Sequence, residues 1–329
     1  MAVKKNKWNG NEKSGKDGNP ASKWLVVGLV ILLLWILSMV IAAGLSLYFG
    51  ADIDLESKVG QGNIAIIPIK GEIASEKPNM LFVQEGTSST KTIQFIKAAE
   101  KDPSVRAIIF DINSPGGSAV ASEEIAHAIK ESTKYKVAVI RDLGASGAYW
   151  IASSSDVIFA SRMSLTGSIG VISSFIQFEG LMDKYGISYE RLVAGERKDI
   201  GSPFREMTDE ERQLFQKKIG LIHEYFINEV AENRNLSSNA RKAIADGSFF
   251  LGSEAKEHGL IDEIGNKDDA IRFIERQLNI TAKPVEYKEK TGFLSNFVDA
   301  LSKPSFFMGQ GIGYALKDVN TESDIGIKT

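Results

Sequence analysis

The stretch Val105-Arg-Ala-Ile-Ile-Phe-Asp-Ile-Asn-Ser-Pro-Gly-Gly117 decides how this chain folds. It begins as a short apolar run rich in Ile, which predicts a buried strand over Val105–Ile112, and it ends in a tight glycine turn. The pattern predicts a helix directly after it, over about 119–134, and a second strand over 136–141. This order predicts parallel strands, with the glycine turn at the carboxyl edge of the sheet.

The same alternation of short strands and helices continues along the chain. The pattern predicts further strands over residues 63–73, 156–160, 169–173 and 188–194, and helices over 92–101, 146–153, 175–185, 209–234, 238–246, 253–258 and 268–277. Pro68 indicates an edge strand or a bulge, because proline cannot donate a hydrogen bond to a sheet. Thr208 supplies an N-cap for the longest helix. We therefore expect an α/β protein with parallel strand pairing.

An uncharged run of 26 residues, from Trp24 to Phe49, precedes these elements. About 20 apolar residues cross the core of a bilayer, whereas the apolar region of a signal peptide has only about 7–15. We therefore predict a transmembrane anchor over 24–49. A cleaved leader is the alternative, with its cleavage site at Ala42-Ala43-Gly44. The six lysines before the run predict a cytoplasmic N-terminus and an extracytoplasmic remainder.

Composition excludes some classes of function and leaves others open. The net charge of −3 gives no global case for nucleic-acid binding. The chain has no cysteine, which excludes disulfides, thiolate zinc sites and a cysteine nucleophile. The sequence shows no metal or cofactor motif, and we expect no cofactor.

Ser146, in Leu143-Gly-Ala-Ser-Gly-Ala-Tyr-Trp150, is a candidate nucleophile. Small neighbours let a carbonyl group approach its hydroxyl, and a strand-to-helix turn presents that hydroxyl at the edge of the sheet. A helix that begins here also directs free N–H groups, such as that of Gly147, at developing negative charge. The alternative is a tight-packing turn, because strings of Gly and Ser are common.

Two further glycine turns strengthen the catalytic interpretation. Gly116 and Gly117 can direct backbone N–H groups toward one point, as an oxyanion hole requires. An ordinary Pro-Gly turn is the alternative. Ser168, in Thr166-Gly-Ser-Ile-Gly170, lies in a second small-residue turn and is a candidate third member that orients the base. A simple turn serine is the alternative there.

The base is less obvious than the nucleophile. His127, His223 and His258 all fall in or at the ends of predicted helices, and none lies in a glycine-rich loop. Lys198 does, which leaves a Ser–Lys dyad as the remaining choice. A lysine acts as a base only where desolvation or nearby positive charge brings its pKa from about 10.4 toward about 7–8. A solvated loop lysine is the alternative.

Four motifs occur in one order: Asn113-Ser-Pro-Gly-Gly117, Gly144-Ala-Ser-Gly-Ala-Tyr-Trp150, Thr166-Gly-Ser-Ile-Gly170 and Lys198-Asp-Ile-Gly-Ser-Pro-Phe-Arg-Glu-Met-Thr208. In this order and spacing they resemble the signal peptide peptidase A family, in its short single-unit bacterial form. The likeness covers roughly residues 60–280. One departure is Glu196-Arg197, where the family more often has a lysine and a small or aromatic residue.

The resemblance implies a serine endopeptidase with the ββα superhelical fold shared by crotonases and Clp protease. By position it assigns the nucleophile to Ser146, the general base to Lys198, support of the lysine to Ser168, and the oxyanion region to Gly116 and Gly117. The implied substrates are remnant signal peptides left in the membrane, and other peptides. The implied assembly is a homo-oligomeric ring or dome, such as an octamer, with serine and lysine contributed by neighbouring subunits.

The residue patterns and the resemblance together give the predicted organisation of the chain. A cytoplasmic basic tail (1–23) and the anchor (24–49) precede a stalk (50–62), a Ser-Lys protease domain (63–280) and a flexible C-terminal tail (281–329). Two rival interpretations stay open at this point. One is a crotonase-type acyl-CoA enzyme, which needs no anchor and no Ser–Lys pair. The other is an anchored, non-catalytic scaffold.

Overall fold

The structure is a computed structural model that describes residues 20–49, 61–76 and 86–288. Two compact units divide the chain, and one of them comprises residues 1–55 and 290–329. Its one described element is helix α1 (Pro20–Phe49), which covers the uncharged run.

Among the described residues, no helix is long and apolar enough to cross a membrane. The transmembrane anchor therefore stays a prediction. Most of the predicted stalk, residues 50–60, and the tail from residue 289 onward lie outside the described residues.

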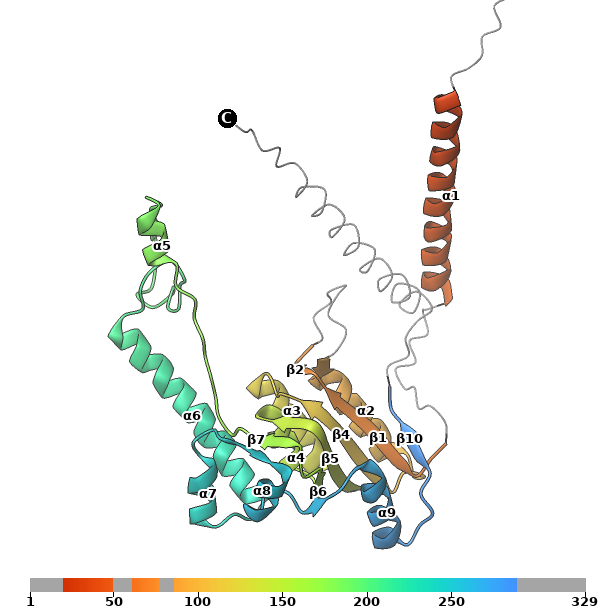
Figure 1. The fold of residues 1–329 in the computed structure, drawn as a ribbon, viewed down its shortest axis with the longest axis vertical. Coiled ribbons are helices and arrows are strands. Elements are labelled where there is room, and N and C mark those ends of the chain that lie inside the picture. Colours follow the sequence, from red (N-terminus) through yellow and green to blue (C-terminus); the bar gives the residue numbers. More distant parts are fainter. Residues whose placement is uncertain (1–19, 50–60, 77–85, 289–329) are drawn as a thin grey trace, which may run out of the picture. The chain divides into compact units, whose positions relative to one another are not determined.

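An eight-stranded mixed sheet forms the centre of the second unit, residues 56–289 (Figure 1). Its main order is β10-β1-β4-β5-β6-β9, with every neighbouring pair parallel; β7 pairs with the end of β5, and β8 runs antiparallel to β7. The strands are β1 (Ile64–Lys70), β4 (Ala107–Ser114), β5 (Tyr135–Ala145), β6 (Val157–Ala160), β7 (Leu165–Gly167), β8 (Phe249–Leu251), β9 (Glu263–Ile264) and β10 (Pro284–Glu286). A small parallel sheet pairs β2 (Glu72–Ala74) with β3 (Gly86–Ser88). The structure confirms the predicted α/β class.

Helices cover both faces of this sheet. One face packs against α2 (Ser89–Lys101), α3 (Ala119–Glu131) and α4 (Gly147–Ser153), and the other against α9 (Lys267–Leu278). Strand β4 shows the alternation: Phe110 faces the α2–α4 side, whereas Ile109 faces α9. Because both faces are buried, the central strands read as continuous apolar runs.

Pro68 lies inside β1 without breaking the sheet. On one side β1 pairs with β4 along its whole length, but on the other it pairs with β10 only over Ile64–Ile66. The N–H groups of Ile64 and Lys70 point to the β10 side, where they donate to Lys283 O and Thr87 Oγ1. A residue at position 68 has the same orientation, so the missing N–H of the proline falls where β10 has already ended. At that point β1 is an edge strand, as predicted.

A register shift between β4 and β5 builds the edge where the glycine turns lie. From the pair Ile112–Ile140 to the pair Ser114–Gly144, β5 advances by four residues while β4 advances by two. Asn113 fills the gap: its Oδ1 accepts from the Leu143 N–H at 3.1 Å, and its Nδ2 donates to Asp142 at 3.3 Å. Beyond the shift, β5 leaves β6 and pairs with β7.

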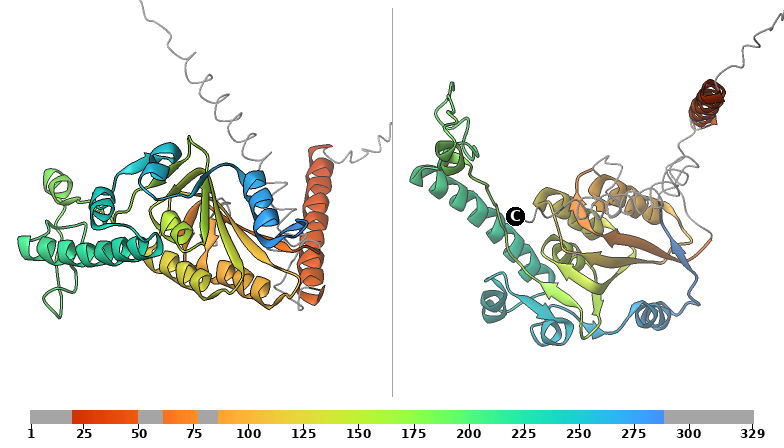
Figure 2. Two further views of the ribbon diagram at one scale, coloured as in Figure 1. Left: turned by 90° about the horizontal axis from the view of Figure 1, so that it is seen from below. Right: turned by 45° about the horizontal axis from the view of Figure 1, so that its top comes forward.

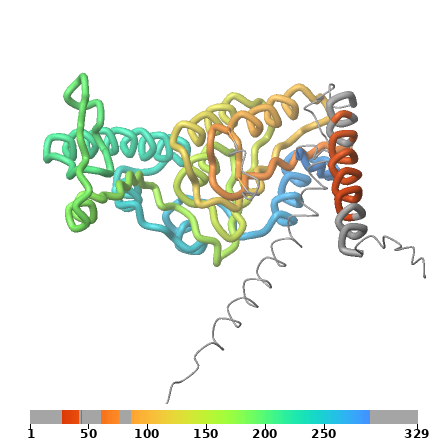
Figure 3. Tube along the Cα trace, turned by 90° about the horizontal axis from the view of Figure 1, so that it is seen from above, coloured from red at the N-terminus to blue at the C-terminus, as the bar shows by residue number. Residues whose placement is uncertain are grey.

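A long extension, which we call the arm, comprises residues 171–220. It contains α5 (Glu179–Lys184) and the N-terminal part of α6 (Asp209–Asn233). Figures 1 and 2 show α5 beside the N-terminal end of α6, away from the sheet, and the tube in Figure 3 shows both parts of the arm projecting on the same side. The C-terminal part of α6 returns to the core, where Phe226, Ile227 and Val230 are buried.

The strands predicted over 169–173 and 188–194 are wrong, because both ranges are irregular in the structure. The helix predicted over 175–185 is only the six-residue α5. These segments contain apolar residues, but much of that surface has no partner among the residues that the structure describes: Ile172 is 91% exposed and Leu192 is 89% exposed. Apolar spacing predicts a strand only where a sheet is available to pair with it.

The remaining helices agree with their predicted positions within a few residues. They are α7 (Ser238–Ile244) and α8 (Gly252–Glu257), in addition to α6 with its capping box at Thr208. Strand β10 lies beyond the predicted domain boundary at residue 280 and pairs with β1, and Val285 and Tyr287 are buried in the core. The sheet therefore extends past that boundary.

Candidate active site

Ser146 stands at the sharp turn between β5 and α4. Its backbone has φ 55° and ψ −128°, a conformation that non-glycine residues rarely adopt and that costs on the order of 1–3 kcal/mol. Its N–H donates to Gly167 O at 2.9 Å, and its carbonyl accepts from the first turn of α4. The residue is only half-buried. The turn therefore places the hydroxyl at the sheet edge, as the sequence predicts.

Ser168 occupies the matching position on the neighbouring strand. Ala145 pairs with Gly167 in the β5–β7 ladder, so Ser146 and Ser168 are the next residues on two adjacent parallel strands. Ser168 also has a positive φ, of 51°, and its N–H donates to Ser248 O at 2.8 Å. Among the described residues, the other non-glycine residues with positive φ are two asparagines, for which that conformation is common. Backbone strain thus coincides at the two candidate serines.

Gly116, Gly117 and Gly147 lie against the Ser146 turn. A Cβ placed on Gly116 would lie 2.9 Å from Ser146 Cβ and 2.7 Å from Gly147 N, and one on Gly147 would lie 3.5 Å from Gly117 N. The Gly147 N–H is the first of α4 and has no acceptor within the helix. Two N–H groups of these turns, those of Gly117 and Gly147, therefore lie close to one another beside the serine, as an oxyanion hole requires.

Backbone pairing with β2 holds the Gly116–Gly117 turn. The Ile73 N–H donates to Gly116 O at 2.9 Å, and the Ser118 N–H donates to Ile73 O at 2.8 Å. The Gly117 N–H lies between these two bonds, and none of the hydrogen bonds shown for the described residues uses it. A Cβ on Gly117 would lie 2.1 Å from Ile73 O, so only glycine allows this approach.

Two buried hydroxyl groups support the turns and were not singled out in the sequence. Ser114 Oγ donates to Gly71 O at 2.6 Å and accepts from the Gly116 N–H at 3.1 Å. Thr166 Oγ1 donates to Gly144 O at 2.7 Å and ties β7 to β5. Both lie inside the quoted motifs, so the available signal was a small hydroxyl residue next to a glycine turn.

Lys198 is not brought to Ser146 within this chain. It lies on the arm, its side chain is exposed, and its N–H donates to Gly195 O at 3.0 Å. The contacts of α6 give the separation: Glu211 pairs with Arg205 near the lysine, whereas Phe226 stacks on Trp150 of α4 at 4.7 Å. The step of fifteen helical residues from Glu211 to Phe226 spans about 22 Å. A lysine side chain does not cover that distance.

The three histidines contact other groups, and His223 lies near the candidate serines, because Ile169 directly follows Ser168. His127 is exposed on α3 beside Glu131, and His223 Nε2 contacts Ile169 O at 2.9 Å. His258 ends α8 and lies against the ring of Phe250. None of these contacts involves Ser146.

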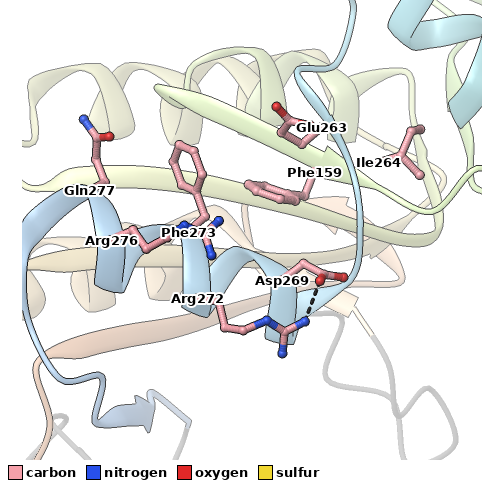
Figure 4. A pocket seen from close by; sticks show the side chains of 8 residues that line it. All are labelled: Phe159, Glu263, Ile264, Asp269, Arg272, Phe273, Arg276 and Gln277. Atoms are coloured by element: carbon pink, nitrogen blue, oxygen red, sulfur yellow. Dashed lines mark hydrogen bonds and ion pairs between the residues drawn. The ribbon is translucent and has the colours of Figure 1, made fainter.

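A cavity of about 470 Å³ lies on the other side of the sheet, against α9 (Figure 4). Arg272 donates to Asp269 at its rim, at 2.6 Å. The lining residues are Phe159, Glu263, Ile264, Asp269, Arg272, Phe273, Arg276 and Gln277. None of the candidate catalytic residues lines this cavity.

Comparison with known proteins identifies the family. The sequence model of peptidase family S49 matches residues 128–281, which include Ser146, Ser168 and Lys198. "Putative protease MJ0651" of Methanocaldococcus jannaschii is 36% identical over 88% of this chain and 93% of its own length. "Putative signal peptide peptidase SppA" of Enterococcus faecium is 31% identical over 84% of this chain and 87% of its own.

Among solved structures, a mutant of the "1510-N membrane-bound stomatin-specific protease" is similar with a TM-score of 0.44, at 17% identity over 65% of this chain and 85% of its own. The extent and identity of the two sequence relatives exceed what a shared fold alone would give, and both are named as peptidases. The chain therefore belongs to peptidase family S49, the family of signal peptide peptidase A.

Proposed function

We propose that this peptidase is a membrane-anchored serine endopeptidase that uses Ser146 and Lys198 as a catalytic dyad and degrades remnant signal peptides. The observation that carries the proposal is the convergence at one sheet edge of a strained serine and two glycine N–H groups. A nucleophile beside two donors is the minimal equipment for acyl transfer. The chain has no cysteine, so the hydroxyl group of Ser146 is the candidate nucleophile that this turn offers.

The proposed reaction follows the serine-peptidase scheme. Lys198, in its neutral form, takes the proton of the Ser146 hydroxyl as the oxygen attacks the peptide carbonyl. The Gly117 and Gly147 N–H groups stabilise the resulting oxyanion, and Gly116 supplies the turn that brings them together. The protonated lysine then gives its proton to the leaving amine, and water hydrolyses the acyl-enzyme. Ser168, beside Ser146, holds the lysine amine through a hydrogen bond.

The dyad forms between neighbouring copies of the chain in this proposal. The length of α6 supports it, because that helix holds the lysine end of the arm far from the serine of the same chain. The exposed apolar side chains of the arm also favour contact with another copy. A head-to-tail contact of this kind closes into a ring, such as an octamer, when the rotation allows it.

The substrate and location proposals rest on the sequence and on the relatives. The uncharged run and the lysine bias favour an anchor over residues 24–49 with an extracytoplasmic catalytic domain. One relative is named as a signal peptide peptidase, which supports signal peptides as substrates. The succession of strands and helices from β4 to β6 supports the ββα superhelical fold of crotonases and Clp protease.

The test compares full-length wild type, Ser146→Ala and Lys198→Ala on a fluorogenic apolar peptide, alone and after the two variants are mixed under conditions that allow subunit exchange. Each variant alone should lose at least about 10⁴-fold in kcat/KM. Ser253→Ala, an exposed serine on α8, is the matched control and should keep full activity.

Mixing should restore up to about a quarter of wild-type activity, because in a random ring a quarter of the sites join an intact serine to an intact lysine. Activity retained by either single variant would contradict the dyad. Loss in both without recovery in verified mixed assemblies would contradict its assembly between subunits.

A further inference from the structure

A group of ion pairs beside Lys198 is not used by the proposed reaction. We call it the arginine–carboxylate cluster, and it comprises Arg191, Asp199, Arg205 and Glu211. Asp199 directly follows Lys198, and both of its carboxylate oxygens accept from two guanidinium groups. Arg191 donates through Nε at 2.5 Å and Nη2 at 2.6 Å, and Arg205 through Nε at 2.9 Å and Nη2 at 3.1 Å.

The cluster connects the lysine to the first turn of α6. Arg205 also forms a fork with Glu211, through Nη1 to Oε2 at 2.8 Å and Nη2 to Oε1 at 2.6 Å. Glu211 is 6% exposed and belongs to the capping box of α6, in which its Oε2 accepts from the Thr208 N–H at 3.0 Å. Asp199 is thus fixed, through Arg205, to the capped start of the long helix.

Backbone geometry restrains the same segment, residues 195–201, which we call the lysine loop. Gly195 and Gly201 have φ values of +93° and +81°, which only glycine adopts readily, and they bracket the loop. Inside it the Lys198 N–H donates to Gly195 O, and the Ser202 N–H donates to Asp199 O at 2.9 Å. Asp199 therefore contributes both a backbone and a side-chain anchor to the loop that carries the lysine.

We propose that Asp199 is the positioning residue for Lys198: clamped between Arg191 and Arg205, it fixes the lysine loop to α6 while its own carboxylate stays engaged away from the lysine amine. The proposal rests on the proposed function of Lys198. It assigns a catalytic effect to residues that touch neither substrate nor the reacting atoms. A free carboxylate next to the base would favour the protonated amine, which cannot accept the proton of the serine.

Among the charged groups around the lysine loop, Asp199 has the largest influence on Lys198, because it directly follows the lysine in the chain. Hydrogen bonds from Arg191, and then from Arg205, hold the pKa of the Asp199 carboxyl well below its usual range. Asp199 therefore stays charged and paired throughout the working pH range. The charged groups that line the hollow beside the loop are Arg191, Glu196, Arg197, Arg205, Glu210 and Glu211, and Asp199 pairs with two of them.

The first test is Asp199→Asn in the full-length protein, which removes both the clamp and the charge. Because a displacement of about 1 Å in a catalytic group can cost about 10²-fold, kcat should fall by about that factor while KM stays nearly constant. In the mixing assay, Asp199→Asn should behave like a variant whose lysine is impaired and whose serine is intact. It should regain activity with Ser146→Ala, which supplies a sound lysine, and not with Lys198→Ala.

The second test separates charge from geometry at Arg191. Arg191→Gln leaves the Asp199–Arg205–Glu211 connection in place but frees part of the carboxylate. The apparent pKa in the pH profile of kcat/KM should rise by about one pH unit. Activity at neutral pH should therefore fall about tenfold and recover at alkaline pH. Arg191→Lys keeps the charge without the fork and should keep the wild-type pH profile with a modestly lower kcat. Arg272→Gln, which removes an exposed arginine–aspartate pair on α9, is the matched control and should change neither.

Wild-type kcat in Asp199→Asn would overturn the proposal. So would losses in Asp199→Asn and Arg191→Gln that are equal at every pH and accompany loss of the assembly, because they would show a merely structural role. Full activity in Lys198→Ala would instead overturn the proposed function. An inactive Lys198→Ala beside a fully active Asp199→Asn would overturn the positioning role alone.

Discussion

The edge of the sheet that carries Ser146, which we call the serine edge, and the arm hold their candidate catalytic groups by different forces. At the serine edge, strands β4, β5 and β7 fix Ser146 and the glycine turns through buried backbone hydrogen bonds. On the arm, ion pairs and aromatic contacts, such as Phe175 against Phe215 at 4.8 Å, hold the lysine loop close to solvent. The candidate nucleophile and the two candidate oxyanion donors therefore lie within one folded unit, whereas the candidate base, Lys198, lies on an exposed part of the arm.

Lys198→Arg is the sharpest way to break this comparison. Arginine keeps the positive charge and much of the length, but it stays protonated and cannot act as a base. We expect a loss as large as that in Lys198→Ala, on the order of 10⁴-fold in kcat/KM, with the assembly intact. Peptide kinetics together with sedimentation analysis measure both effects. If the arginine variant kept substantial activity, Lys198 would have only an electrostatic or structural role.

Phe226→Ala tests the joint between the two regions. Phe226 is 2% exposed and stacks on Trp150 of α4, the helix that begins directly after Ser146. Loss of a buried aromatic side chain should lower the free energy of unfolding by about 3–5 kcal/mol. Tyr225→Ala, next to it but 64% exposed, should change that free energy by no more than about 0.5 kcal/mol. Denaturant unfolding measures both; equal effects would mean that α6 is not joined to the core at this stack.

Gly147→Ala tests the oxyanion geometry within the serine edge. The added Cβ would lie 2.2 Å from Ser122 Oγ, so the turn must move, and loss of one oxyanion donor typically costs about 10²–10³ in rate. The closest clash is with the Ser122 hydroxyl group, whereas Ser122 Cβ would stay at 3.1 Å. Ser122→Ala in the same chain should therefore restore only part of the activity, while Ser122→Ala alone should stay near wild type. Peptide kinetics on the three variants measure this coupling. An undiminished kcat in Gly147→Ala would remove Gly147 from the proposed site.

Acid pH should destabilise the arm, whereas pH changes around neutrality should not, and this is the smallest effect that we expect. Hydrogen bonds from Arg205 lower the pKa of the Glu211 carboxyl, and those from Arg191 and Arg205 lower that of Asp199. Carboxyl groups with lowered pKa values contribute stability above their unfolded pKa values, about 4, and lose it as the pH falls through the folded values. Hydrogen exchange over residues 195–211 should therefore be protected equally at pH 5 and 8 and lose protection below about pH 4. A transition between pH 6 and 8 would point to a different group.

The prediction agrees with the structure where an element depends on residues close together in the chain, and fails where it depends on distant ones. The core strand of β4, the long helix α6 and its Thr208 cap are set by local pattern, and the prediction placed them within one or two residues. Strands β7 to β10 have only two or three residues each, too few to show a period, and they exist because a partner strand is present. The strands predicted in the arm are wrong because its apolar residues face outward rather than into a sheet.

The sequence by itself determined the class of the protein, the family motifs and the identity of the candidate nucleophile, because turn glycines and a strand-to-helix serine are local signals. Only the tertiary structure decided that Ser168 stands beside Ser146, because that follows from the β5–β7 register, and that Lys198 stands apart, because that follows from the direction and length of α6. Both depend on contacts between residues far apart in the chain. Local periodicity does not encode such contacts, and so the relative placement of Ser146 and Lys198 could not be predicted from the sequence of one chain.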